Sequence, residues 1–213
     1  MAGADLSWVK MAGADLRRAD MAGTDLRGAE MAGADLSWAE MVGADLSAAT
    51  MDGATLRGAK MAGADLRAAE MDGAVLSAAD VAGADLSAAN MAGVDLRGAK
   101  MAGAGFSEAK MTGADLRRAK MAGADLRGAT LQSANLAFWS CVRANARSAD
   151  FTEARNMTQE QVNSLFGDHD TKLPDTDADG ALLQRPPQFD NEPLEYTWDP
   201  DPAYEVWLKS LAP

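Results

Sequence analysis

The chain has 213 residues, with 20 Lys and Arg against 32 Asp and Glu, so its formal net charge at pH 7 is −12. No stretch approaches the ~20 apolar residues of a membrane span, and the repeat begins at Met1 without a charged-then-apolar leader, which predicts a cytoplasmic protein with no membrane contact. The acidic total also disfavours direct binding of nucleic acid, because phosphates would be repelled.

An apolar residue recurs at every fifth position through the first 150 residues. Leucine returns every ten residues from Leu6, and methionine lies midway from Met11 onward. In an α-helix, five-residue steps of about 140° each would spread these side chains around the whole cylinder. In a flat strand they would alternate between the two faces. A chain that turns a corner every five residues points all of them inward, so the period predicts a solenoid.

The residues around each central position repeat as well. Ala4-Asp5-Leu6, Ala14-Asp15-Leu16 and Ala134-Asn135-Leu136 all follow the motif A-[D/N]-L-x-x. The chain thereby resembles the pentapeptide-repeat family, with thirty pentapeptides centred from Leu6 to Phe151. The resemblance implies an all-β solenoid, a right-handed quadrilateral β-helix with four pentapeptides per coil. Seven and a half such coils, at about 4.8 Å each, would make a rod roughly 36 Å long.

The aspartates that precede leucines should stack into columns. Residues 20 positions apart lie above one another in such a coil, and like charges about 5 Å apart repel by roughly 1 kcal/mol in water. Arginines two residues further on, such as Arg17, Arg27 and Arg67, are placed to interleave with them, and aspartates near corners also bond backbone amides. The columns have two interpretations. In the first, the aspartates bond to their own turns and alternate with arginines in a charge ladder; in the second, they form a surface that binds a partner.

Charge is uneven along the chain. Residues 1–90 contain 7 basic and 14 acidic residues, whereas residues 91–155 contain 10 and 6. One end of the rod is therefore acidic and the other basic, which favours head-to-tail or charge-steered contacts. The first motif is already in register at Ala4, so the N-terminal coil is expected to pair with another chain or to fray.

The repeat loses its regularity after Thr130, and the composition changes near Arg155. We expect a repeat domain over 1–155 and a second region over 156–213. Thr158 is a candidate N-cap of a short helix that runs through Phe166, ends at Gly167 and covers the open coil. The acidic, proline-rich stretch 174–202 is expected to run extended along the rod or to stay mobile.

The last segment has the spacing of an amphipathic helix. Tyr204, Trp207, Leu208 and Leu211 fall at i, i+3, i+4 and i+7. About nine residues are too few for a helix that is stable alone in water. The segment is therefore expected to dock on its own solenoid, on a second copy or on a partner protein.

The sequence contains only weak signals of a catalytic or metal-binding site. The opening D-x-D-x-D-G of a calcium loop occurs at 175–180, but its closing position is Pro186, which has no oxygen-bearing side chain. The single histidine, His169, has no nucleophile placed beside it, and the single cysteine, Cys141, falls at an inward position where a buried, reduced thiol is expected. The sequence predicts no enzyme activity, no cofactor and no metal.

Two functions follow. The first is a rod-shaped scaffold that binds proteins and self-associates, as a homodimer. The second comes from the resemblance, because some members of the family mimic DNA and occupy the duplex-binding site of DNA gyrase. Duplex DNA of 36 Å carries roughly 20 negative charges, whereas residues 1–155 net only −3, so the mimic is the alternative. The candidate partner-binding residues are Asp5, Asp15, Asp25, Asp35, Asp45, Asp65, Asp85, Tyr204, Trp207, Leu208 and Leu211. A basic patch at Arg117, Arg118, Lys120 and Arg127 leaves direct nucleic-acid binding as a distant third.

Overall fold

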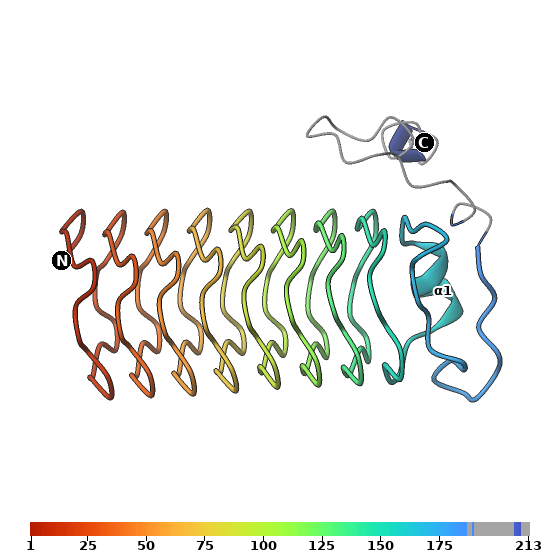
Figure 1. Cartoon of the computed structure of the whole chain (residues 1–213), viewed down its shortest axis with the longest axis horizontal. Coiled ribbons are helices and arrows are strands. Elements are labelled where there is room, and N and C mark those ends of the chain that lie inside the picture. The colour runs from red at the N-terminus through yellow and green to blue at the C-terminus, as the bar shows by residue number, and fades with distance from the viewer. Residues whose placement is uncertain (187–188, 190–206, 210–213) are drawn as a thin grey trace.

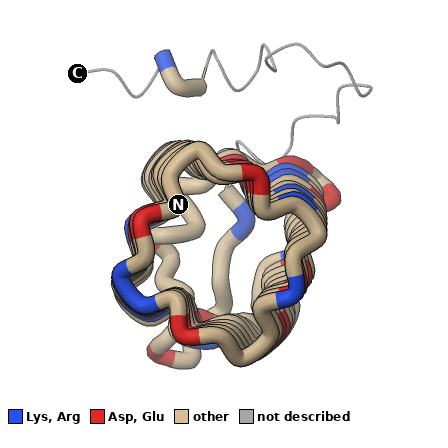
Figure 2. The backbone as a smooth tube through the Cα atoms, turned by 90° about the vertical axis from the view of Figure 1, so that its left-hand side faces the viewer, with Lys and Arg blue, Asp and Glu red and all other residues tan. Residues whose placement is uncertain are grey.

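The computed structural model describes residues 1–186, 189 and 207–209 of the chain. Residues 1–172 wind into successive coils of a rod, with the N-terminus at one end (Figure 1). Parallel bridges join residues 20 positions apart at every fifth residue, from the pair Asp5 and Asp25 to the pair Asn135 and Arg155. Each coil thus holds 20 residues, or four pentapeptides, which form its four sides (Figure 2).

Each pentapeptide turns at the two residues that follow its central apolar residue. The N–H of Ala29 donates to the carbonyl oxygen of Leu26 at 3.0 Å and closes one such turn. The second turn residue has a positive φ, as at Gly28 (61°), which is the geometry that a type II turn requires. Glycine adopts this backbone without steric cost, and this accounts for much of the glycine in the sequence.

Backbone hydrogen bonds between neighbouring coils hold the rod together. The N–H of Leu26 donates to the carbonyl oxygen of Asp45 at 2.7 Å, and the N–H of Asp25 donates to that of Ala4 at 2.9 Å. The same two bonds recur on all four sides, so extended positions occur as isolated bridges rather than as long strands.

The interior is filled by the central residues and by the alanines two positions before them. Met31 and Ala29 are fully buried, as are their equivalents through the regular coils. In the first coil Leu6, Met11 and Leu16 are only partly buried and pack against this core. The predicted inward direction of leucine, methionine and alanine is therefore confirmed.

The coil after Thr130 fills the same interior with different residues. Trp139 stands where earlier coils have alanine; it is 3% exposed, and its ring centroid lies 6.1 Å from that of Phe151. Cys141 is buried, and that burial raises the pKa of its thiol to about 12. The predicted burial of Cys141 as a free thiol is therefore confirmed.

Helix α1 spans Gln159–Asn163. Thr158 is its N-cap, as predicted, and forms a capping box in which its side chain accepts from Gln161 N–H while the Gln161 side chain accepts from Thr158 N–H. The predicted end of the helix at Gly167 is wrong, because α1 ends at the C-cap Ser164. Phe166 instead returns to the coil and pairs with Asn145 in a parallel bridge.

The described part of the segment after α1 lies against the end of the rod. Leu173 and Leu183 pack on the core, and Thr176 pairs with Leu182 in an antiparallel bridge. Phe189 is fully buried, with ring atoms 2.7 Å from the place where a Cβ on Gly167 would lie. The expectation that residues 174–202 run along the rod or stay mobile is therefore wrong for 174–186 and 189; the rest of that stretch lies outside the described residues.

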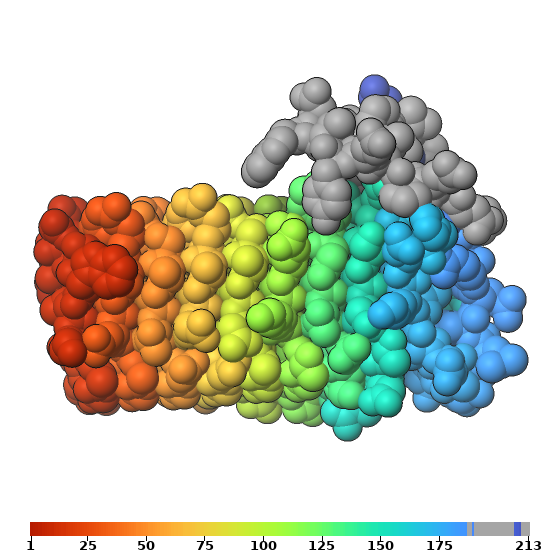
Figure 3. Space-filling model, in the orientation of Figure 1, coloured from red at the N-terminus to blue at the C-terminus, as the bar shows by residue number. Residues whose placement is uncertain are grey.

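On the face that Figure 3 shows, neighbouring described coils lie against one another without breaks. Among the residues that the structure describes, no helix is long and apolar enough to cross a membrane.

Candidate interaction surface

The predicted aspartate columns exist. Parallel bridges place five of the candidate aspartates above one another along one side of the rod, namely Asp5, Asp25, Asp45, Asp65 and Asp85. Two more, Asp15 and Asp35, start the column on the opposite side, which Thr55 and Val75 then interrupt.

Each of these carboxylates is bonded to the residue two positions later. Asp45 Oδ1 accepts from the N–H of Ser47 at 3.0 Å and from its hydroxyl at 2.7 Å. Where arginine stands in place of serine, its side chain takes over the second bond, and Arg67 Nη2 donates to Asp65 Oδ2 at 2.5 Å. The predicted bonding of aspartate to nearby amides is confirmed.

The arginines also bridge successive coils. Arg27 lies 2.5 Å from Asp25 Oδ2 and 3.7 Å from Asp45 Oδ2. The Arg27 side chain, and then its N–H, hold the pKa of Asp25 below its ordinary value, and the same bond raises the pKa of Arg27. The charge ladder inferred from the sequence is therefore present, and part of the negative charge in this column is locally compensated.

The opposite column is compensated more completely. Arg17 Nη2 lies 2.6 Å from Asp15 Oδ2, and Arg17 Nε lies 3.7 Å from Asp35 Oδ2. The bonds from the Arg17 side chain and N–H lower the pKa of Asp15 to about 2. Both carboxylates in this stretch share one guanidinium, so neither presents an isolated negative charge.

Of the four C-terminal candidates, the structure describes Trp207 and Leu208. The Trp207 ring packs on Phe166, with centroids 5.3 Å apart and planes inclined by 39°. Residues 207–209 are helical, and Trp207 and Leu208 are half-buried. Tyr204 and Leu211, the other two residues of the predicted amphipathic stripe, lie outside the described residues.

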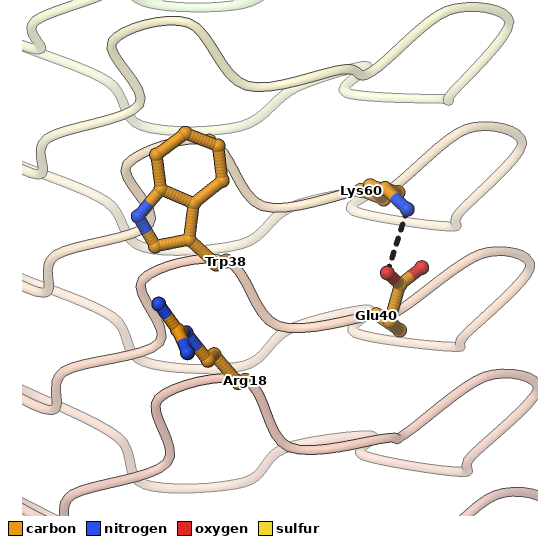
Figure 4. Close-up of a pocket in the computed structure, with 5 residues that line it drawn as sticks. Arg18, Trp38, Glu40 and Lys60 are labelled. Atoms are coloured by element: carbon orange, nitrogen blue, oxygen red, sulfur yellow. Dashed lines mark hydrogen bonds and ion pairs between the residues drawn. The ribbon is translucent and has the colours of Figure 1, made fainter.

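A groove at one corner of the rod was not found from the sequence. It is lined by Arg18, Trp38, Glu40, Gly58 and Lys60. Arg18 and Trp38 extend from successive coils at the same corner, and the Glu40–Lys60 ion pair of 2.7 Å lies beside them on the adjoining side (Figure 4). The groove therefore combines an indole with charges of both signs.

The indole of Trp38 is supported by the coil above it. Trp38 is 55% exposed, yet a Cβ on Gly58 would lie only 2.6 Å from its ring, so the ring covers that glycine. Trp8 covers Gly28 in the same way at the opposite corner. A tryptophan followed 20 residues later by glycine is the sequence signal that could have revealed both sites.

The described residues contain no group of three or more His, Cys, Asp or Glu that could hold a metal ion. In the loop at 175–180, Asp177 Oδ1 accepts from the N–H groups of Asp179 and Ala181, as in a polar turn. His169 Nε2 lies 3.3 Å from Asp170 Oδ1 on the surface. These contacts serve local structure.

A family model described as pentapeptide repeats matches the chain with eight copies, within residues 1–37, 29–67, 39–77, 69–107, 79–118 and 106–138. No curated protein matches the sequence.

Several solved structures are similar. HetL, from the cyanobacterium Nostoc sp. strain PCC 7120 and involved in heterocyst differentiation regulation, is 22% identical over 84% of this chain and 92% of its own, with a TM-score of 0.32. QnrB1, a plasmid-mediated fluoroquinolone resistance protein, is 19% identical over 86% and 90%, with a TM-score of 0.44. The pentapeptide repeat protein alr5209 from Nostoc PCC 7120 is 30% identical over 51% and 84%, with a TM-score of 0.38.

Proposed function

Since the chain belongs to the pentapeptide-repeat family, we propose that it is a non-enzymatic, rod-shaped protein-interaction module that self-associates as a homodimer. The observation that carries this proposal is the unbroken stack of coils from Asp5 to Arg155, which displays identical positions every 20 residues on each side. A rigid, periodic surface of this kind offers many weak contacts in a fixed register, as solenoid proteins use for binding.

The surroundings of the aspartates and of the cysteine support a role in binding rather than in catalysis. The aspartates of the two columns bond to their own turns, and the thiol of Cys141 is held protonated by burial. These carboxylates and this thiol are therefore engaged in the structure of the coil. We extend the proposal to a cytoplasmic location and to the absence of direct nucleic-acid binding.

The finer architecture belongs to the same proposal. We take the coil to be right-handed, with 1–155 as the repeat domain and 156–213 as the second region. Val162 in α1 and Leu165 just after it belong to the buried core, which supports α1 as a cap over the last coil. The seven aspartates and the four C-terminal residues predicted to bind a partner remain candidates.

A second candidate function is mimicry of DNA at the duplex-binding site of DNA gyrase. The column from Asp5 to Asp85, with five carboxylates in successive coils, favours it. The arginines weigh against it, because Arg27 and Arg67 each contact two members of that column. Residues 1–90 net −7 over about 20 Å, where DNA would carry roughly 12 charges, so this function ranks second.

The test measures both functions on the full-length protein. Multi-angle light scattering at micromolar concentrations should give the mass of a dimer, and a gyrase supercoiling assay should show neither inhibition nor protection from inhibitors. A strict monomer would contradict self-association. Inhibition that is lost in the double variant Asp45→Lys/Asp65→Lys, but not in Lys110→Glu on another side, would replace the scaffold with the DNA mimic.

A further inference from the structure

One side of the rod carries charges of both signs in a definite order. We call it the mixed-charge face; bridges join its residues in successive coils, and they are Asp20, Glu40, Lys60, Asp80, Lys100 and Lys120. Four of the six are exposed, and Glu40 and Asp80 are half-exposed. Along the rod the signs run negative, negative, positive, negative, positive, positive.

Within one chain only the middle of this face is paired. Glu40 lies 2.7 Å from Lys60, and Lys100 lies 3.8 Å from Asp80. In the described residues, Asp20 and Lys120 at the two ends form no ion pair. They stand five coils apart, or about 24 Å at a spacing of about 4.8 Å, and cannot meet within one chain.

The order of signs becomes its own complement when the face is reversed. Suppose that a second copy lies antiparallel on the first, with the two-fold axis midway between residues 60 and 80. Each residue of the face then meets the residue at the same distance on the other side of this axis. Asp20 faces Lys120, Glu40 faces Lys100 and Lys60 faces Asp80. All three pairs join opposite charges, and two-fold symmetry makes each pair twice. We propose that the mixed-charge face is the interface of an antiparallel homodimer.

The corner beside this face allows close approach. Its outer residues are small in every coil, and they are Ala22, Val42, Ala62, Ala82, Ala102 and Ala122, each followed by a glycine. No long side chain on this edge would hold two copies apart. The charged groups opposite one another could therefore reach hydrogen-bonding distance across the two-fold axis, between residues 60 and 80.

The other edge of the face offers a fit for Trp38. In a face-to-face antiparallel pair, each edge lies against the same edge of the second copy, so Trp38 in the second coil meets Gly98 in the fifth. A Cβ on Gly98 would have no heavy atom within 4 Å, which leaves room for an incoming ring. The exposed side of the indole, whose other side covers Gly58, would be buried by this contact.

The columns of aspartates do not have this property. Reversal of the column from Asp5 to Asp85 places carboxylate on carboxylate, and reversal of the column that starts at Asp15 and Asp35 sets these residues against Asp95 and Asp115. Like charges that face each other oppose association. The mixed-charge face is thus distinguished from them by charge order.

One contact opposes the proposed pairing. Arg18 and Arg118 occupy the same edge in the first and sixth coils, so they would face each other at both ends of the interface. Both are exposed, and long side chains there can turn toward water. This like-charge pair gives the proposal a distinctive prediction, because its removal should strengthen the dimer.

The test is sedimentation equilibrium of the full-length protein, with three single variants that alter net charge equally and one charge swap that leaves it unchanged. Lys120→Glu places a carboxylate opposite Asp20 and should raise the dimer Kd about tenfold. The swap Asp20→Lys/Lys120→Glu should restore the Kd to within about threefold of wild type. Lys110→Glu, an exposed lysine on another side of the rod, should change the Kd less than about twofold.

Arg118→Glu makes the same change in net charge as Lys120→Glu but should act in the opposite direction, lowering the Kd several-fold by facing Arg18. If Lys120→Glu leaves the Kd unchanged, if the swap fails to restore it, or if Arg118→Glu weakens the dimer, the interface lies elsewhere.

This inference rests on the proposed self-association, and the two can fail separately. A wild-type protein that stays monomeric refutes both. A dimer that is insensitive to Lys120→Glu but is dissociated by deletion of 203–213 keeps the self-association and refutes the mixed-charge face.

Discussion

The regular coils and the coil that ends the rod solve the same packing problem in different ways. Between residues 21 and 130, each side of each coil buries a leucine, methionine or similar residue with a small residue, usually alanine, two positions earlier. Beyond residue 130, Trp139, Cys141 and Phe166 take up the interior, and each of these environments occurs once in the chain. Repetition makes the regular coils equivalent, whereas the end depends on individual residues.

An aspartate from each region shows a second difference, in how far along the chain its hydrogen-bond donors lie. The carboxylate of Asp45 in a regular coil accepts hydrogen bonds from Ser47, two residues away, and lies 3.7 Å from Arg27 Nε in the preceding coil. Asp168 in the terminal region is 1% exposed and accepts from the N–H and hydroxyl of Ser148 and from the N–H and hydroxyl of Thr171. The hydrogen bonds of the first carboxylate finish a turn, whereas those of the second tie two coils together.

Asp168→Ala should therefore destabilise the protein more than the removal of an aspartate from a regular coil. It leaves four donors without this acceptor and removes the carboxylate that lies 3.5 Å from Arg147 Nε. We expect a loss of about 3–5 kcal/mol in the free energy of unfolding, the usual effect of breaking a buried charged network. Denaturant unfolding followed by circular dichroism measures it.

Asp45→Ala is the matched change in a regular coil. Its carboxylate is partly exposed, its two hydrogen bonds are local and its ion pair with Arg27 is long at 3.7 Å, so we expect a loss of about 1 kcal/mol. Equal losses for the two variants would show that the terminal coil is no more dependent on single residues than the regular ones.

The sequence was sufficient for the repetitive part of the fold and insufficient for the unique part. The five-residue period fixes which side chains of the regular coils point inward, because all coils share one geometry. The role of Asp168 depends on how the chain returns from α1 to Ser148, and no local pattern encodes that path. The aspartate columns followed from the 20-residue coil, but the corner groove at Trp38 did not, because it needs the contact with Gly58 in the next coil.

The corner at Trp38 allows a sharper test of the equivalence of regular coils. Gly58 and Gly98 have the same backbone, with φ of 64° and 65°, and Ala78 lies between them in the column with φ of 58°. Gly98→Ala should cost about 1 kcal/mol for a side chain at positive φ. Gly58→Ala also forces the Trp38 ring away, and should cost about 2–4 kcal/mol in total.

Intrinsic tryptophan fluorescence reports on the same pair of variants. At concentrations below the dimer Kd, where Trp38 of a second copy does not cover Gly98, only Gly58→Ala should alter the emission, because within one chain it alone displaces an indole. If both glycines tolerate alanine equally and the emission is unchanged, the ring does not rest on Gly58 in solution.

The smallest expected difference between the two regions is in how much folding stability each loses in acid. The pKa of Asp15 and that of Asp150 are both lowered to about 2, from 3.8. The pKa of Asp15 is lowered by Arg17, two residues away. Burial raises the pKa of Asp150, but the hydrogen bonds from Thr152, Lys172 and Gln132 outweigh burial and lower it. A carboxyl group whose pKa is lower in the folded state stabilises the fold above its unfolded pKa, so this stabilisation is complete above about pH 4 and is lost toward pH 2.

The two losses should differ because the unfolded chain keeps some local contacts. Arg17 stays near Asp15 after unfolding, whereas Lys172 lies 22 residues from Asp150 and separates from it. Asp150→Asn should therefore flatten the fall in stability between about pH 4 and pH 2 more than Asp15→Asn does. Urea unfolding at intervals across this range measures the slopes, and a larger effect of Asp15→Asn would mean that the short-range pair in the regular coil contributes more to the fold than the long-range one.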